Sequence, residues 1–186
     1  ILVGALDGCL YKGMAFIYLG GPAPNNVSDL TLLGAVNDDI FGWSVAGAGD
    51  INGDGFDDMI VGAPQNDSGG SNAGRAYVYF GGSTLNAVAD LTLTGEAAGD
   101  QFGYAVSGAG DVNSDGFDDV LVGAPFNDAA GTSSGRGYIY YGGTSPNNVA
   151  DLVMTGAAAQ SLGRAVSTAG DLNGDGFADV ALGGWS

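Results

Sequence analysis

The chain has 186 residues, and its 21 acidic side chains outnumber four lysines and arginines, which gives a formal net charge of −17. A protein this acidic is repelled by nucleic acid and by anionic membrane surfaces, so we expect neither as a partner. The absence of histidine removes the commonest general base and metal ligand. The sequence contains no run of eighteen apolar residues, the length needed to span a membrane as a helix. Cys9 is the only cysteine, so an intrachain disulfide is impossible.

Short apolar and aromatic strands are predicted first along the chain. Residues 1–5, Ile-Leu-Val-Gly-Ala, match segments that recur at 60–63, 121–124 and 181–184. The chain therefore starts part-way through a repeat, and we expect it to be cut from something longer. Aromatic side chains alternate over residues 14–21, and the same pattern returns at 75–82 and 136–143. A period of two indicates a strand with one aromatic face, which we interpret as core packing.

A strand of alternating leucine and threonine comes next, at residues 29–34, 90–95 and 151–156. A Phe-Gly pair follows at 41 and 102, with Leu-Gly at 162, and leads into a strand rich in glycine, alanine and serine. A polar loop then precedes the next apolar strand. One period thus holds four short strands, and its length of 61 or 60 residues signals a repeat protein.

The polar loop reads D-x-N-x-D-G-x-x-D in all three copies, at residues 50–58, 111–119 and 171–179. Side-chain oxygens at positions 1, 3, 5 and 9, with the main-chain carbonyl at position 7, form an oxygen-only donor set of the kind that Ca²⁺ prefers. An EF-hand is excluded, because its position-12 glutamate is replaced by Val61, Val122 and Leu182. Solvated turns are the alternative, but three copies in register favour about three calcium sites. The predicted ligands are Asp50, Asn52, Asp54, Phe56, Asp58, Asp111, Asn113, Asp115, Phe117, Asp119, Asp171, Asn173, Asp175, Phe177 and Asp179.

Four-stranded repeats of this kind predict an all-β fold, a β-propeller-type array of about three four-stranded antiparallel blades. The Gly/Ala strand is expected innermost, where a propeller leaves little room. A parallel β-helix is disfavoured because its repeat is much shorter.

The Phe-Gly pair, the calcium-type loop and the Gly-Ala-Pro that follows it resemble FG-GAP repeats over the whole chain. These are the blades of integrin α-subunit propellers and of related bacterial surface proteins. The third copy departs from the pattern, with Leu162 for phenylalanine and Gly184-Trp185 in place of Ala-Pro. The resemblance implies that each loop joins the first two strands of a blade and binds Ca²⁺. It divides the chain into a partial blade 1–40, blades 41–101 and 102–161, and a partial blade 162–186, an open array that is a fragment or an assembling protomer.

These features predict a non-catalytic, calcium-binding extracellular or cell-surface module for adhesion or interaction. A protein or glycan partner is expected on the face opposite the calcium loops. One alternative is a structural segment that self-associates with other copies of itself, and a lesser one is part of a secreted propeller hydrolase, since a carboxylate pair needs only two acids. Asp57 and Asp118 should point away from the metal, because Ala178 takes their place in the third loop. The varied residues after the Phe-Gly or Leu-Gly pair should line a groove or face solvent; they are Trp43, Tyr104 and Arg164.

Overall fold

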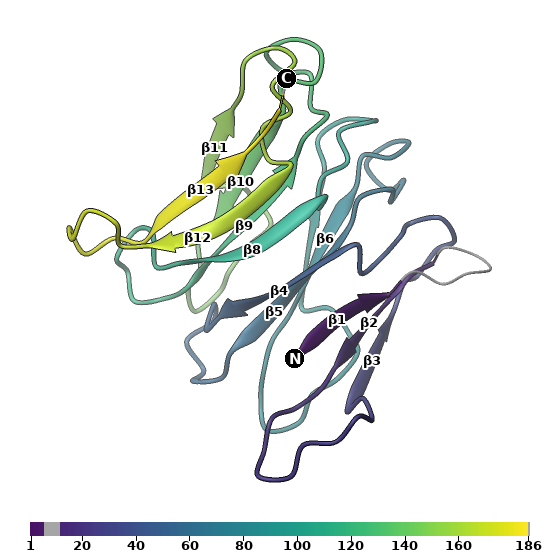
Figure 1. Cartoon of the computed structure of the whole chain (residues 1–186), viewed down its shortest axis with the longest axis vertical. Coiled ribbons are helices and arrows are strands. Elements are labelled where there is room, and N and C mark those ends of the chain that lie inside the picture. Colours follow the sequence, from purple (N-terminus) through teal and green to yellow (C-terminus); the bar gives the residue numbers. More distant parts are fainter. Residues whose placement is uncertain (6–11, 186) are drawn as a thin grey trace.

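The computed structural model describes residues 1–5 and 12–185. These residues form four antiparallel sheets (Figure 1). They contain no helix, as the sequence predicts. Within the same residues there is accordingly no helix that could cross a membrane. The Cys9 thiol lies outside the described residues.

Two of the sheets have four strands in simple sequence order. One contains β4 (Ser44–Gly49), β5 (Asp58–Ala63), β6 (Arg75–Tyr79) and β7 (Leu91–Thr94). The next contains β8 (Ala105–Gly110), β9 (Asp119–Ala124), β10 (Arg136–Tyr140) and β11 (Leu152–Thr155). A three-stranded sheet precedes them, with β1 (Leu2–Ala5), β2 (Met14–Ile17) and β3 (Leu30–Leu33). A two-stranded sheet follows, with β12 (Ala165–Gly170) and β13 (Asp179–Gly183).

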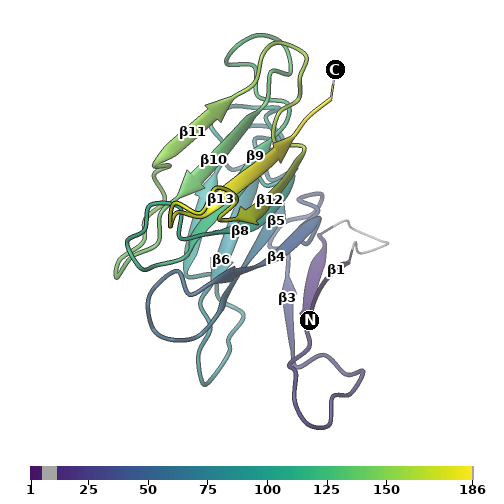
Figure 2. The same cartoon turned by 60° about the vertical axis from the view of Figure 1, so that its left-hand side comes forward.

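The sheets are stacked through their first strands. β4 packs against β8, and β8 against β12, so these three glycine- and alanine-rich strands lie next to one another (Figure 2). A strand of small residues allows this close approach, and the prediction that it lies innermost is confirmed. The array is a set of whole and partial propeller blades that does not close.

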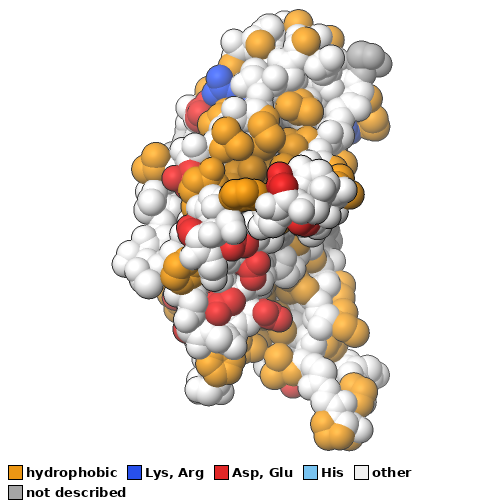
Figure 3. All heavy atoms as spheres, turned by 90° about the vertical axis from the view of Figure 1, so that its left-hand side faces the viewer, with side chains coloured by type: hydrophobic (Ala, Val, Ile, Leu, Met, Phe, Trp, Pro, Cys, Tyr) orange, Lys and Arg blue, Asp and Glu red, His pale blue; other side chains and the backbone are white. Residues whose placement is uncertain are grey.

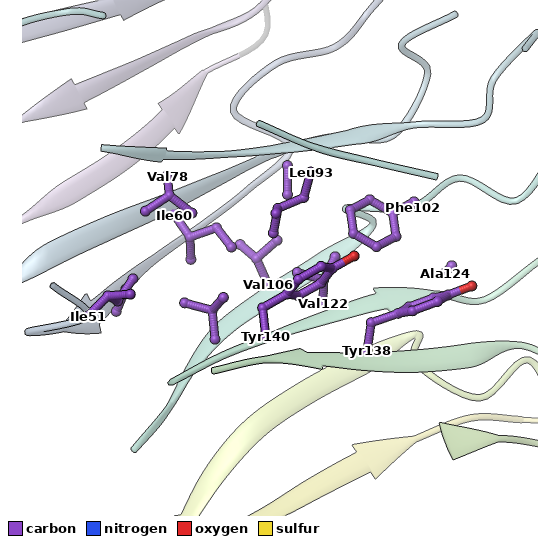
Figure 4. Close-up of a cluster of buried hydrophobic side chains, with 13 residues drawn as sticks. Ile51, Ile60, Val78, Leu93, Phe102, Val106, Val122, Ala124, Tyr138 and Tyr140 are labelled. Atoms are coloured by element: carbon purple, nitrogen blue, oxygen red, sulfur yellow. The ribbon is translucent and has the colours of Figure 1, made fainter. Parts of the chain in front are cut away.

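The main core lies between the second and third sheets (Figure 4). Ile60, Val78 and Leu93 of one sheet are fully buried against side chains of the next. The Phe102 ring contacts Tyr138 edge-to-face, with 5.3 Å between ring centroids. Tyr138 and Tyr140 are themselves buried, which confirms that the alternating aromatic stripe is core packing.

Glycine is required where consecutive repeats touch. The Gly103 amide donates to the Gly123 carbonyl of its own repeat at 3.0 Å. The Gly103 carbonyl oxygen lies against Gly62 of the preceding repeat, at the place where a Cβ on Gly62 would stand. The same contact joins Gly163 to Gly123. The Phe-Gly and Gly-Ala-Pro motifs are therefore two sides of one contact between repeats.

This contact predicts a large difference between two glycine-to-alanine changes in neighbouring strands. Gly62→Ala should lower the free energy of unfolding by about 1–3 kcal/mol, because its methyl group meets backbone that cannot move aside easily. Gly47→Ala in β4 is the matched control, since nothing lies within 4 Å of the place its Cβ would take. Urea unfolding measures both, and equal stabilities for the two variants would contradict the proposed contact.

Candidate metal centre

The three polar loops connect β4 to β5, β8 to β9 and β12 to β13, and all lie on the left of Figure 1. Figure 3 views the molecule from that side and shows acidic side chains gathered in the middle of the face. Each loop begins after a bulge in the first strand and contains a glycine at position 6 with φ near 90°. Only glycine adopts this left-handed backbone readily, which explains Gly55, Gly116 and Gly176.

The first aspartate of each loop organises the backbone around it. Asp50 Oδ1 accepts from the amides of Gly53 at 2.8 Å and Asp54 at 3.0 Å, and its Oδ2 accepts from Gly55 at 2.9 Å. Asp171 makes the same three bonds in the third loop. The amide of Gly176 is the main cause that lowers the pKa of the Asp171 carboxyl below its ordinary value. This carboxylate is thus held ionised while it fixes the turn.

Positions 3 and 5 contact each other directly. Asn52 Nδ2 donates to Asp54 Oδ2 at 3.2 Å, while Asn52 Oδ1 accepts from the Asp54 amide at 2.8 Å. Asp54 Oδ1 accepts from the Phe56 amide at 2.9 Å. The corresponding bonds recur in the other two loops. The ligands predicted at positions 1, 3 and 5 are therefore brought together in every copy.

The position-9 aspartates of the first two loops are buried and serve a second purpose. Asp119 is 0% exposed, and its two oxygens accept from the amides of Val112 and Gly142, both at 2.8 Å. Asp58 makes the equivalent bonds to Ile51 and Gly81. Burial raises the pKa of Asp119 to about 6, and the charges of Asp115 and Asp111 add to the shift. These carboxylates tie the loop to the segment after the third strand, a role that the sequence did not reveal.

The structure thus gathers the ligands predicted at positions 1, 3 and 5 and turns position 9 toward backbone amides. Among residues 1–5 and 12–185, no group of three or more acidic, cysteine or histidine side chains is already arranged as a metal site. The ligand assignment remains a prediction.

Position 8 connects one repeat to the next. Asp118 Oδ2 accepts from the Asp50 amide at 2.9 Å, and the Asp118 amide donates to the Asp50 carbonyl at 3.2 Å. Asp118 thus turns to the preceding loop instead of its own, while Asp57 is exposed. Ala178 keeps only the main-chain bond, to the Asp111 carbonyl. Periodicity marked these positions as equivalent but gave no sign of the contact between repeats.

Two buried polar pairs lie at the opposite end of the strands, and each joins consecutive repeats. Asn66 Nδ2 donates to Asp39 Oδ2, and Asn127 Nδ2 donates to Asp100 Oδ2, each at 2.7 Å. All four side chains are buried. Burial raises the pKa of Asp39 and of Asp100, and the asparagine hydrogen bond opposes the shift. These pairs join the segment before each Phe-Gly to the segment after each Gly-Ala-Pro.

This pair predicts a pH dependence that can be isolated in Asp100→Asn. A folded-state pKa above the ordinary aspartate value of 3.8 means that the folded protein binds the proton more tightly than the unfolded chain. The stability that this proton contributes is fully present below pH 3.8 and is lost as pH rises through the raised pKa of Asp100. The negative charges of Glu96 and Asp128 add to the rise in this pKa. Relative to Asp100→Asn, the wild type should therefore lose stability over this window in urea titrations. A difference between the two proteins that does not change with pH would contradict the assignment.

The residues after the Phe-Gly or Leu-Gly pairs also lie at this end. Trp43 is 44% exposed, and Tyr104 and Arg164 are half-buried. The prediction that they border a groove or solvent is confirmed. Sequence reasoning did not foresee that Tyr104 contacts both Trp43 and Arg164.

The comparisons with known proteins agree with this geometry. The FG-GAP repeat model matches residues 41–79 and 102–140, the segments from each Phe-Gly through the third strand of its sheet. The chain belongs to the FG-GAP repeat family. Integrin alpha-7 of Rattus norvegicus is 38% identical to this FG-GAP chain over 184 residues, 93% of the chain and 15% of the relative. Integrin alpha-5 of Xenopus laevis is 34% identical over 156 residues, 77% of the chain and 14% of the relative. Integrin alpha-6 of Gallus gallus is 35% identical over 153 residues, 78% of the chain and 13% of the relative. The chain therefore spans only a small part of these relatives' length.

Proposed function

We propose that this FG-GAP chain is a non-catalytic interaction module of an extracellular or cell-surface protein, stiffened by Ca²⁺. The observation that carries the proposal is the loop D-x-N-x-D-G-x-x-D, which recurs three times at the same end of the sheets in a chain similar to integrin alpha-subunits. The proposed structural units are residues 1–40, 41–101, 102–161 and 162–186.

The donor chemistry of the loops fits a hard divalent cation. Eleven of the 21 acidic residues lie in the three loops, which offer carboxylate and amide oxygens and no nitrogen or sulfur ligand. The first, third and fifth positions are already adjacent through direct hydrogen bonds. Two unit charges 4 Å apart repel by about 4 kcal/mol at an effective dielectric near 20, so grouped carboxylates favour a bound cation. We propose the aspartate and asparagine side chains at positions 1, 3, 5 and 9, with the position-7 carbonyl, as ligands.

Calcium in this role is structural, and its removal should loosen the fold. A metal that binds only the folded state stabilises it by about 2.7 kcal/mol per site at a hundredfold excess over Kd. We expect a higher melting temperature in millimolar calcium than in EGTA, and a smaller difference in Asp111→Ala. Differential scanning calorimetry of both proteins in both buffers provides the measurement. Identical melting temperatures in all four samples would show that the loops are ordinary turns.

The partner-binding face is proposed at the end opposite the loops. The β5–β6 and β9–β10 connections lie there, together with the side chains that follow each Phe-Gly. Loops and varied side chains on a rigid scaffold are the usual place for recognition. A protein or a glycan is the proposed class of partner.

Association between copies is a second candidate, favoured by a difference between equivalent residues. Leu172 is 77% exposed, whereas Ile51 at the same loop position is 2% exposed. Phe56 and Asp57 are also exposed, although Phe117 and Asp118 border the preceding loop. Sedimentation velocity in calcium distinguishes the two functions. We expect a monomer for the interaction module, and a concentration-dependent increase in mass would instead support self-association.

A further inference from the structure

Large aromatic side chains form a row across two neighbouring repeats at the end opposite the polar loops. The Trp43 and Tyr104 rings have centroids 5.4 Å apart, and Tyr104 meets Phe126 edge-to-face at 6.1 Å. Trp43 and Tyr104 come directly before β4 and β8, while Phe126 follows β9. The row therefore crosses the boundary between neighbouring sheets.

Arg164 extends this row with a guanidinium group. Its central carbon lies 3.7 Å from the Trp185 ring centroid, 5.1 Å from that of Tyr104 and 5.8 Å from that of Phe126. A cation–π contact uses the positive charge of the guanidinium and does not itself require its five N–H donors. Among residues 1–5 and 12–185, Arg164 has no ion pair and no side-chain hydrogen bond, whereas Arg136 pairs with Glu96.

The guanidinium borders a surface pocket of about 460 Å³. The pocket is lined by Tyr104, Arg164, Ala165, Gly183, Gly184 and Trp185. The aromatic rings restrict the arginine side chain, so little conformational entropy remains to be lost when its donors are used. The pocket thus presents one oriented cation beside flat apolar surfaces, on a protein that is otherwise strongly acidic.

We propose that this pocket binds a carboxylate side chain, aspartate or glutamate, of a protein partner. The planar fork of arginine matches a carboxylate with two parallel hydrogen bonds. Three side chains bring polar atoms to the pocket, Arg164, Tyr104 and Trp185 through its indole N–H. They are too few to satisfy the many hydroxyls of a buried sugar. The net charge of −17 repels polyanions, so the acidic residue lies in a neutral or basic segment. This inference rests on the proposed function, because it names the chemistry of the partner at the same face.

The experiment uses the two tryptophans, whose indole N–H signals are observable by NMR in the ¹⁵N-labelled chain in millimolar calcium. Trp43→Phe identifies the Trp185 signal. The probe is an acetylated and amidated pentapeptide, Gly-Ala-Asp-Phe-Gly, compared with its asparagine twin. We expect the aspartate peptide to shift the Trp185 signal saturably, and the asparagine peptide to bind about tenfold or more weakly because the charge-assisted bonds are lost.

Variants of the arginine separate its charge from its geometry. Arg164→Gln should lose the preference for aspartate, and Arg164→Lys should retain part of it, because lysine keeps the charge without the fork. Arg136→Gln is the matched control, since that arginine is paired elsewhere, and it should bind as the wild type does. Unchanged NMR signals from residues outside the pocket would show that each variant is folded.

Three results would overturn the proposal. They are equal affinity for the two peptides, unchanged binding in Arg164→Gln, and binding of neither peptide. A glucuronate oligosaccharide that shifts the Trp185 signal when the aspartate peptide does not would also overturn it, since the partner would then be a glycan. The calcium melt tests the proposed function separately. Calcium-dependent stability without peptide binding would contradict only the proposal that the pocket binds a carboxylate. Peptide binding without an effect of calcium on stability would contradict only the proposal of a calcium-stiffened module.

Discussion

The close approach of main chains between neighbouring sheets is the constraint on which the rest of the structure depends. The Gly103 carbonyl occupies the space where a side chain on Gly62 would stand, and the contact recurs one repeat further along. It allows the first strands to pack directly against one another and brings the Phe102 ring over the aromatic strand of its own sheet. Two sequence motifs some twenty residues apart are thereby explained by a single contact, in which each repeat supplies one half to its neighbour.

The three polar loops belong to the same system of contacts between repeats. Each loop begins where an innermost strand ends, and Asp118 bonds both ways with the main chain of the preceding loop at Asp50. The buried Asp119 ties its loop to Gly142, beyond the third strand of the same sheet. A cation bound at one loop would therefore act on a segment that is already joined to its own sheet and to the previous repeat. This explains how a polar loop at one end of the molecule can contribute to the stability of the array.

Periodicity made most of the fold predictable. The order of the strands, the buried aromatic stripe and the place of the loops follow from residues that recur every 60 or 61 positions. Contacts between repeats did not follow, because a period states which residues are equivalent and not which neighbour they touch. Hydrogen bonds from main-chain amides, such as those to Asp58 and Asp119, leave no partner side chain in the sequence. The Asp39–Asn66 pair could have been found, since an aspartate and an asparagine 27 residues apart recur at Asp100 and Asn127.

The two ends of the strands are chemically different but mechanically connected. One end of β8 leads into the acidic loop at Asp111, and the other begins beside Tyr104 in the aromatic row. A six-residue strand spans only about 20 Å. At the aromatic end, the Phe126 amide donates to the Asp100 carbonyl at 3.4 Å, and the buried Asp100–Asn127 pair holds the same two segments together. The spacing between Tyr104 and Phe126 is therefore set by buried polar contacts and by short, paired strands. The proposed stiffening by a cation at the loop end would act on a face whose geometry is already fixed. Such a face suits the proposed recognition by preorganised side chains more than recognition by movement.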